Sequence, residues 1–169
     1  MERQRGFEVI SRYKDQQIQL PVRSTHFSAG YDIEAAERTV IPSLPRQLHA
    51  LAQDETEQMD IIPTTLVPTG LKAYMQEDEY LQLINRSSNP MKRNLCLPNS
   101  VGIIDQDYYN NPNNEGHIFV QLVNYGPNDY IIEKGERICQ GIFAKYYTTD
   151  QDSDHTHKAE RSGGFGSTD

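Results

Sequence analysis

The sequence predicts an all-β domain of sandwich or jelly-roll type. Short apolar runs rich in β-branched and aromatic residues recur along the chain. Proline and glycine separate them, for example at Pro68-Thr69-Gly70 and Gly126-Pro127. The chain has 169 residues, which fits one domain of ordinary size. Many short strands with frequent turn signals are typical of sandwiches and jelly rolls.

The expected strands follow these apolar runs. In chain order they are Phe7–Ile10, Ile18–Val22, Thr39–Ile41, Ile61–Val67, Leu71–Met75, Tyr80–Ile84, Ile103–Ile104, Ile118–Val123, Tyr130–Ile132 and Ile138–Tyr147. Each run is short and bounded by turn residues, which favours a strand over a helix.

A short helix is expected to interrupt the strands after residue 43. Ser43 is a suitable N-cap, and Pro45 falls in the first turn, where its missing N–H costs nothing. Three leucines then share one helical face: Leu44, Leu48 and Leu51. The acidic stretch Gln53–Asp60 that follows is expected to be a solvated loop, or else a partner site.

The last 22 residues differ from the rest, so the chain divides into a β domain over 1–147 and a tail over 148–169. Thr148–Glu160 is polar and cannot bury itself. The segment from Arg161 to Asp169 is rich in glycine but carries a phenylalanine. Composition alone leaves two readings open, an inert tail and a flap ordered by a ligand.

Charge and cysteine content exclude several classes of protein. The formal net charge of −8 argues against a general nucleic-acid binder. Basic residues without acidic ones gather at 80–100, namely Arg86, Lys92 and Arg93, which is one place for an anionic ligand. Two cysteines are too few for a disulfide framework. No apolar run approaches the ~18 residues of a membrane span. We therefore expect a cytoplasmic protein without membrane contact.

The common nucleotide and metalloprotease motifs are absent from the sequence, which lacks a Walker A loop, a Rossmann glycine pattern and an H-E-x-x-H pair. Five other segments resemble, in order, the five motifs of the trimeric dUTP pyrophosphatases (dUTPases). They are Ala29–Ala36, Arg86–Ser88, Asn99–Tyr108, Gly135–Gln140 and the glycine-rich end. The resemblance implies a distorted jelly-roll or β-barrel of the dUTPase type with one or two short helices. It also implies a homotrimer with active sites at subunit interfaces.

The resemblance implies Mg²⁺-dependent hydrolysis of dUTP to dUMP and pyrophosphate. Asp105 would be the general base that directs a water in line at the α-phosphate. The backbone of 99–104, including Gly102 and Ile104, would present N–H and C=O groups to the edge of uracil, and Asn99 would add a side-chain bond. Tyr108 would lie under the sugar and leave no room for a 2′-hydroxyl.

Phosphate contacts would come from the other motifs. Ser87 would donate to an oxygen between the α and β phosphates, assisted by the N–H near Ser88. Arg86 would bind phosphate or a supporting carboxylate, and Gln140 would bind phosphate or its hydration shell.

The glycine-rich end would form a lid over the bound nucleotide. Arg161 would clamp the γ-phosphate, Phe165 would stack on uracil, and Gly166 and Ser167 would donate N–H groups. Mg²⁺ would be held by phosphate oxygens and waters, with Asp32 either orienting one such water or serving the core.

Three departures from the family pattern stand out. The second motif reads Asn85-Arg-Ser-Ser88, and Asn89-Pro90 then opens one helical turn through Met91–Asn94. A longer hairpin, 109–115, follows Asp107-Tyr108. One residue is missing between Arg161 and the Gly-Gly-Phe core, which shifts the reach of the arginine by about 3.5 Å.

Two alternatives remain. The first is a dCTP deaminase, or a bifunctional deaminase and dUTPase, of the same fold. That family needs a glutamate where this chain has Gln121, and an amide cannot shuttle protons. The second is a non-catalytic nucleotide-sensing module, for which the 43–60 insertion would supply a partner site.

Overall fold

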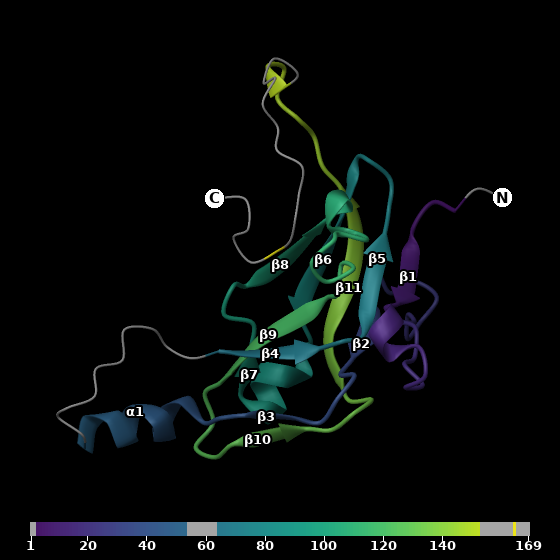
Figure 1. Cartoon of the computed structure of the whole chain (residues 1–169). Helices are drawn as coiled ribbons and strands as arrows, with labels where there is room; N and C mark the ends of the chain where they lie inside the picture. Colours follow the sequence, from purple (N-terminus) through teal and green to yellow (C-terminus); the bar gives the residue numbers. More distant parts are fainter. Residues whose placement is uncertain (1–2, 54–63, 153–163, 165–169) are drawn as a thin grey trace.

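Antiparallel strands dominate the computed structural model, which describes residues 3–53, 64–152 and 164 (Figure 1). The strands form four small sheets, with two, two, four and three members. Every strand pair is antiparallel. The all-β prediction is confirmed. No helix in the described ranges is long and apolar enough to cross a membrane.

The elements in chain order are β1 (Gly6–Val9), η1 (Ser11–Tyr13), β2 (Tyr31–Glu34), β3 (Thr39–Ile41), α1 (Leu44–Gln53), β4 (Thr65–Pro68), β5 (Leu71–Tyr74), β6 (Glu79–Asn85), η2 (Asn89–Arg93), β7 (Leu95–Cys96), β8 (Val101–Asp105), η3 (Gln106–Tyr108), β9 (Phe119–Asn124), β10 (Tyr130–Ile132) and β11 (Arg137–Lys145).

The largest sheet has the strand order β2-β11-β6-β8. The long strand β11 pairs with β2 on one side and with β6 on the other, so Gln140 lies opposite both Asp32 and Ile84. Strand β8 is at the end of this order, and its second edge pairs with no strand in the described part of the chain.

One core lies between the sheets. Its largest fully buried side chains are Tyr13, Ile33, Ile41, Leu71, Leu81, Leu95, Ile118, Leu122, Ile132, Ile138, Val67 and Val120. They come from nearly every strand, and each large aliphatic side chain contributes about 1.5–3 kcal/mol through burial. Cys139 on β11 is fully buried among them, and burial raises the pKa of its thiol.

The predicted helix begins where expected, but the apolar face predicted for it is not buried along its whole length. The N–H of Arg46 donates to Ser43 Oγ at 3.3 Å, as expected for an N-cap. Leu44 is buried, whereas Leu48 is 46% exposed. Figure 1 shows the reason, because α1 extends away from the sheets and little of the body covers it.

The strand predictions succeed except in three places. Residues 18–22 form no strand, and only an isolated bridge joins Val22 to Asp32. Pro21 interrupts the run and Leu20 and Val22 are exposed, so the segment forms no continuous ladder, although Ile18 packs against the core. Strands β2 and β7 were not predicted from the sequence. Residues 61–63 of the fourth predicted strand lie outside the described residues.

His117 is a buried titratable group at the start of β9. The side chain is 5% exposed, and its Nε2 accepts the N–H of Gly70 at 3.0 Å. The rings of Tyr13 and Phe119 lie 5.4 and 4.1 Å from it. Burial, with a smaller contribution from the charge of Arg12, lowers the pKa of His117 to about 4. The folded chain therefore holds this imidazole neutral.

We expect the free energy of unfolding to decrease as the pH falls from 6.5 towards 4. In that window the unfolded His117 takes up a proton that the folded chain excludes, so the unfolded state is favoured. The loss should be about 1.5 kcal/mol between pH 6.5 and 5. Denaturant melts at several pH values measure it.

His117→Gln is the matched control, because the amide oxygen can accept from Gly70 without titrating. The free energy of unfolding of this variant should depend less on pH between pH 6.5 and 5. An unchanged slope would assign the pH dependence to other groups. Glu115, whose pKa is lowered to about 2 chiefly by its bond to Lys72, acts at lower pH.

Candidate active site

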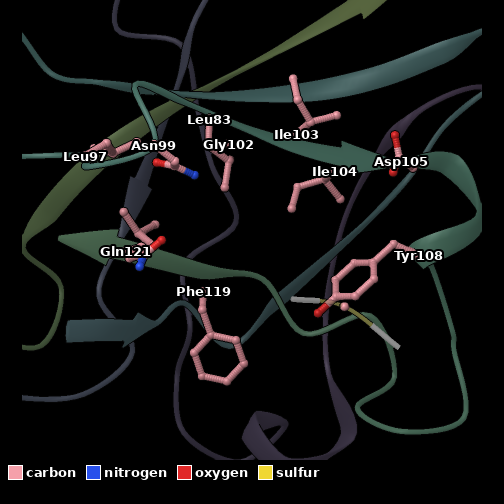
Figure 2. Close-up of a pocket in the computed structure, with 12 residues that line it drawn as sticks. Leu83, Leu97, Asn99, Gly102, Ile103, Ile104, Asp105, Tyr108, Phe119 and Gln121 are labelled. Carbon is pink, nitrogen blue, oxygen red and sulfur yellow. The ribbon is translucent and has the colours of Figure 1, made fainter. Parts of the chain in front are cut away.

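A pocket of about 190 Å³ opens between β8 and β9 (Figure 2). Its lining residues are Leu83, Leu97, Asn99, Gly102, Ile103, Ile104, Asp105, Tyr108, Phe119, Val120, Gln121 and Gly164. Asn99 and Gln121 lie towards one end, and Asp105 and Tyr108 lie towards the other. The pocket thus has an apolar floor and polar groups at both ends.

Gly102 keeps the floor of this pocket open. It pairs with Leu83 on β6, and a Cβ at Gly102 would lie 3.2 Å from the Cβ of that leucine. The backbone of β8 is accessible as well, because its second edge has no strand partner among the described residues. N–H and C=O groups along such an edge are available to a ligand.

Asp105 and Tyr108 are brought together by a change of direction at the end of β8. Asp105 is still extended, with φ −77° and ψ 158°, and the 3₁₀ turn η3 begins at the next residue. The turn returns Tyr108 to the same pocket. Tyr108 is 6% exposed, and its hydroxyl donates to the carbonyl of His117 at 2.9 Å.

A second polar group surrounds Asp32 on β2. Arg86 Nε lies 3.3 Å from Oδ1, and Arg137 lies 3.2 Å from Oδ2. Gln140 Nε2 donates to Oδ1 at 3.3 Å, and Ser24 Oγ donates to Oδ2 at 2.7 Å. We call these five residues the Asp32 cluster. It holds two guanidiniums and one carboxylate, a surplus of positive charge that suits an anion.

The cluster also determines the ionisation of its carboxylate. Burial alone would raise the pKa of Asp32, but the bonds from Ser24 and Gln140 and the two guanidiniums outweigh it, so the pKa is lowered. Arg137, at 47% exposure, reaches solvent more than Arg86, at 22%. Arg137 is therefore a further candidate for an anionic ligand, which the motif comparison did not single out.

The Asp105 end of the pocket and the Asp32 cluster lie at opposite ends of β6. Asp105 pairs with Tyr80, near the start of that strand. Arg86 comes just after its end, six residues beyond Tyr80. At ~3.3 Å per residue this separation is about 20 Å. Within one chain, Arg86 and Asp105 therefore lie too far apart to act at the same atom.

The predicted site residues thus fall into three sets. Asn99, Gly102, Ile104, Asp105 and Tyr108 line the pocket. Arg86, Gln140 and Asp32 form the cluster, and Ser87 and Ser88 follow Arg86 directly, with Ser87 exposed. Arg161, Phe165, Gly166 and Ser167 lie outside the described residues.

Sequence reasoning missed part of the pocket wall. Leu83 and Phe119 lie outside the five motifs, and Gln121 was considered only for the deaminase alternative. The predicted turn at Asn89-Pro90 is confirmed as η2, one turn of π-helix. Asn89 does not cap it. Its side chain is buried and donates to Asn85 Oδ1 and to the carbonyl of Ile138, which ties this turn to β6 and β11.

The fold and the two polar groups define an all-β protein with a small pocket and a separate cluster suited to an anion. Comparison with known proteins narrows this class. A family model described as dUTPase matches residues 51–169. The deoxyuridine 5'-triphosphate nucleotidohydrolase of Lactococcus lactis is 51% identical over 164 residues, covering 97% of each chain. That of Rickettsia felis is 34% identical, covering 88% of this chain and 87% of the relative.

Solved structures agree with these relatives. The dUTPase of Streptococcus mutans superposes with a TM-score of 0.72 at 48% identity, covering 86% of this chain and 98% of that one. The dUTPase of phage phi11 of S. aureus superposes at 0.65 and 17% identity over 98% and 99%, which bears on the fold alone. The chain belongs to the dUTPase family, and its activity is the hydrolysis of dUTP.

Proposed function

We propose that this chain converts dUTP to dUMP and pyrophosphate through a water activated by Asp105. The observation that supports this most strongly is the geometry of the pocket. One carboxylate and one aromatic ring meet at the same end of a small apolar cavity, beside an open strand edge. A carboxylate can accept the proton of a water that attacks the α-phosphorus in line.

The open edge of β8 supports recognition of uracil by the backbone. Alternating N–H and C=O groups of an unpaired strand can match the donors and acceptors of one base. Cytosine reverses the donor and acceptor at its position 4, so the same pattern would leave groups unpaired. Asn99, at the far end of the pocket, is placed to add a side-chain bond.

Gln121 bears on the alternative of deamination. Its side chain lines the pocket, and its amide donates to Thr64 Oγ1 at 2.6 Å. Hydrolytic deamination needs a group that gives and takes a proton, which an amide does not do. Release of pyrophosphate from dUTP, compared with release of ammonia from dCTP, distinguishes hydrolysis, deamination and mere binding in one set of assays.

We propose that Mg²⁺ arrives with the substrate. Among the described residues no three His, Cys, Asp or Glu side chains gather as a metal site. Mg²⁺ commonly binds through substrate phosphates and waters, where it neutralises their charge. The oxygens of Asp32 already accept from Arg86, Arg137, Gln140 and Ser24, which favours a role in holding these donors over a role in orienting a magnesium water.

The distance between pocket and cluster supports a site shared between subunits. A general base and the donors to the attacked phosphate must lie within a few ångströms of one phosphorus. In one chain Asp105 and Arg86 are about 20 Å apart along β6. We therefore propose a homotrimer in which the pocket of one subunit faces the Asp32 cluster and Ser87 and Ser88 of its neighbour.

The glycine-rich end is proposed to close this site. Gly164 lines the pocket, and a Cβ there would lie 2.9 Å from Cε2 of Tyr108. Only glycine therefore fits against this ring. In the single chain Gly164 lies at its own pocket.

Asp105→Asn should lower kcat for dUTP about 10²–10⁴-fold while nucleotide still binds. The amide keeps the shape of the side chain but is not basic. Steady-state pyrophosphate release and binding of a non-hydrolysable dUTP analogue measure the two effects. Asp107→Asn, on an exposed neighbour, is the control. If Asp105→Asn turns over dUTP at close to the parent rate, Asp105 is not the general base.

A mixture of two inactive variants tests the shared site. Asp105→Asn and Arg86→Ala subunits, refolded together in equal amounts, should regain about a quarter of the parent activity, because a quarter of the interfaces pair an intact Asp105 with an intact Arg86. Each variant refolded alone is the control. If the mixture stays as inactive as its components, both residues act within one subunit.

Truncation after Glu160 should leave the fold and assembly intact but lower turnover by ~10²-fold or more, since the removed segment would exclude water from the reaction. Sedimentation and pyrophosphate release are the measurements. A truncated enzyme that works at close to the full-length rate would show that the tail is inert.

A further inference from the structure

The segment 109–116, which connects η3 to β9, holds Tyr108 at both ends. At the ring end, Asn114 Nδ2 donates to the tyrosine hydroxyl at 2.7 Å, while the hydroxyl donates to the carbonyl of His117 at 2.9 Å. At the backbone end, Asn111 Nδ2 donates to the carbonyl of Tyr108 at 2.9 Å. Because two of these bonds meet at the hydroxyl, the ring cannot be displaced without breaking at least one of them.

The two asparagines also fix each other. Asn111 Nδ2 donates to Asn114 Oδ1 at 2.8 Å, and the N–H of Gly116 donates to the same oxygen at 3.1 Å. The amide oxygen of Asn114 thus serves the loop, which leaves its amide nitrogen directed at Tyr108. Gly116 has a φ of +81°, and a Cβ there would lie 2.7 Å from the carbonyl of Tyr108.

An ion pair and hydrogen bonds attach this loop to the rest of the protein. Glu115 Oε1 lies 2.7 Å from Lys72 Nζ, and Oε2 accepts the N–H of Ser11 at 2.9 Å. Lys72, which is buried, also donates to Asn110 Oδ1 at 2.6 Å. The asparagines are therefore presented to Tyr108 by a rigid support rather than by a loose hairpin.

We propose that Asn114 is a positioning residue that sets the selection of deoxyribose over ribose, an inference that rests on the role proposed for Tyr108. A ring excludes a 2′-hydroxyl only if it cannot retreat from it. The hydrogen bond from Asn114 opposes that retreat, because its loss would leave the ring held by His117 alone. The hairpin that departs from the family pattern thereby acts on sugar specificity without touching the substrate.

The test compares kcat/KM for dUTP and UTP. Asn114→Ala should lower the dUTP-to-UTP ratio about 3- to 10-fold, the value of one hydrogen bond. Tyr108→Phe removes the hydroxyl and should lower the ratio at least as much. In the Tyr108→Phe background, Asn114→Ala should have no further effect, because the bond it removes is already absent. A merely structural role would lower stability in both backgrounds alike.

Asn113→Ala is the matched control, since Asn113 lies in the same loop but is exposed, and should keep the parent ratio. An unchanged ratio in Asn114→Ala, or additive effects in the double variant, would overturn the inference. If Asn114→Ala does not fold, an unchanged ratio in Tyr108→Phe overturns it equally. Tyr108→Ala distinguishes failure of the role proposed for Asn114 from failure of the role proposed for Tyr108. If Tyr108→Ala keeps the parent dUTP-to-UTP ratio, Tyr108 does not select the sugar.

Discussion

The register of β11 is the constraint on which both the core and the site depend. This strand pairs with both β2 and β6, and Cys139, Gln140 and Gly141 are fixed by the two ladders at once. Cys139 turns into the core, and Gln140, the next residue, turns to Asp32. A slip of one residue would exchange the two faces, burying an amide and removing a donor from the cluster.

An acidic protein can bind a polyanion because its positive charge is concentrated. The chain has 24 acidic and 16 basic residues, yet two guanidiniums share the single carboxylate of Asp32. Arg93 lies close by, bonded to the carbonyl of Arg137 and paired with Glu136 at 3.0 Å. Local arrangement, and not net charge, decides the sign of the potential that a phosphate meets.

Local signals were enough to predict most of the fold. Short apolar runs between turn residues predicted most strands, and the Ser43 cap predicted the start of α1, because caps and turns are decided by a few neighbouring residues. The prediction of a strand over 18–22 was wrong because the segment forms only an isolated bridge to a neighbouring strand, although Ile18 packs against the core. The exposure of Leu48 could not be foreseen either, since helical periodicity says which side is apolar but not whether anything covers it.

Sequence reasoning predicted individual site residues but not their arrangement. The motifs identified Asp105, Tyr108 and Arg86 one by one, while the 20 Å between the first and the last depends on the register of β6 and β8. The walls supplied by Leu83, Phe119 and Gln121 depend on tertiary pairing for the same reason. Likewise, the asparagines of 109–116 look like an ordinary polar turn in the sequence, and only the structure shows that Asn114 bonds the hydroxyl of Tyr108 and Asn111 its carbonyl.

The open edge of β8 carries a cost that reaches beyond catalysis. Most proteins shield the edges of their sheets, because an unpaired strand is a template on which other extended chains can add. Here that edge pairs with no strand among the described residues, and Val101 and Ile103 of the same strand are exposed apolar side chains. Nucleotide bound along the edge would occupy the same backbone groups. A cell short of this substrate would therefore hold the protein in its most aggregation-prone form.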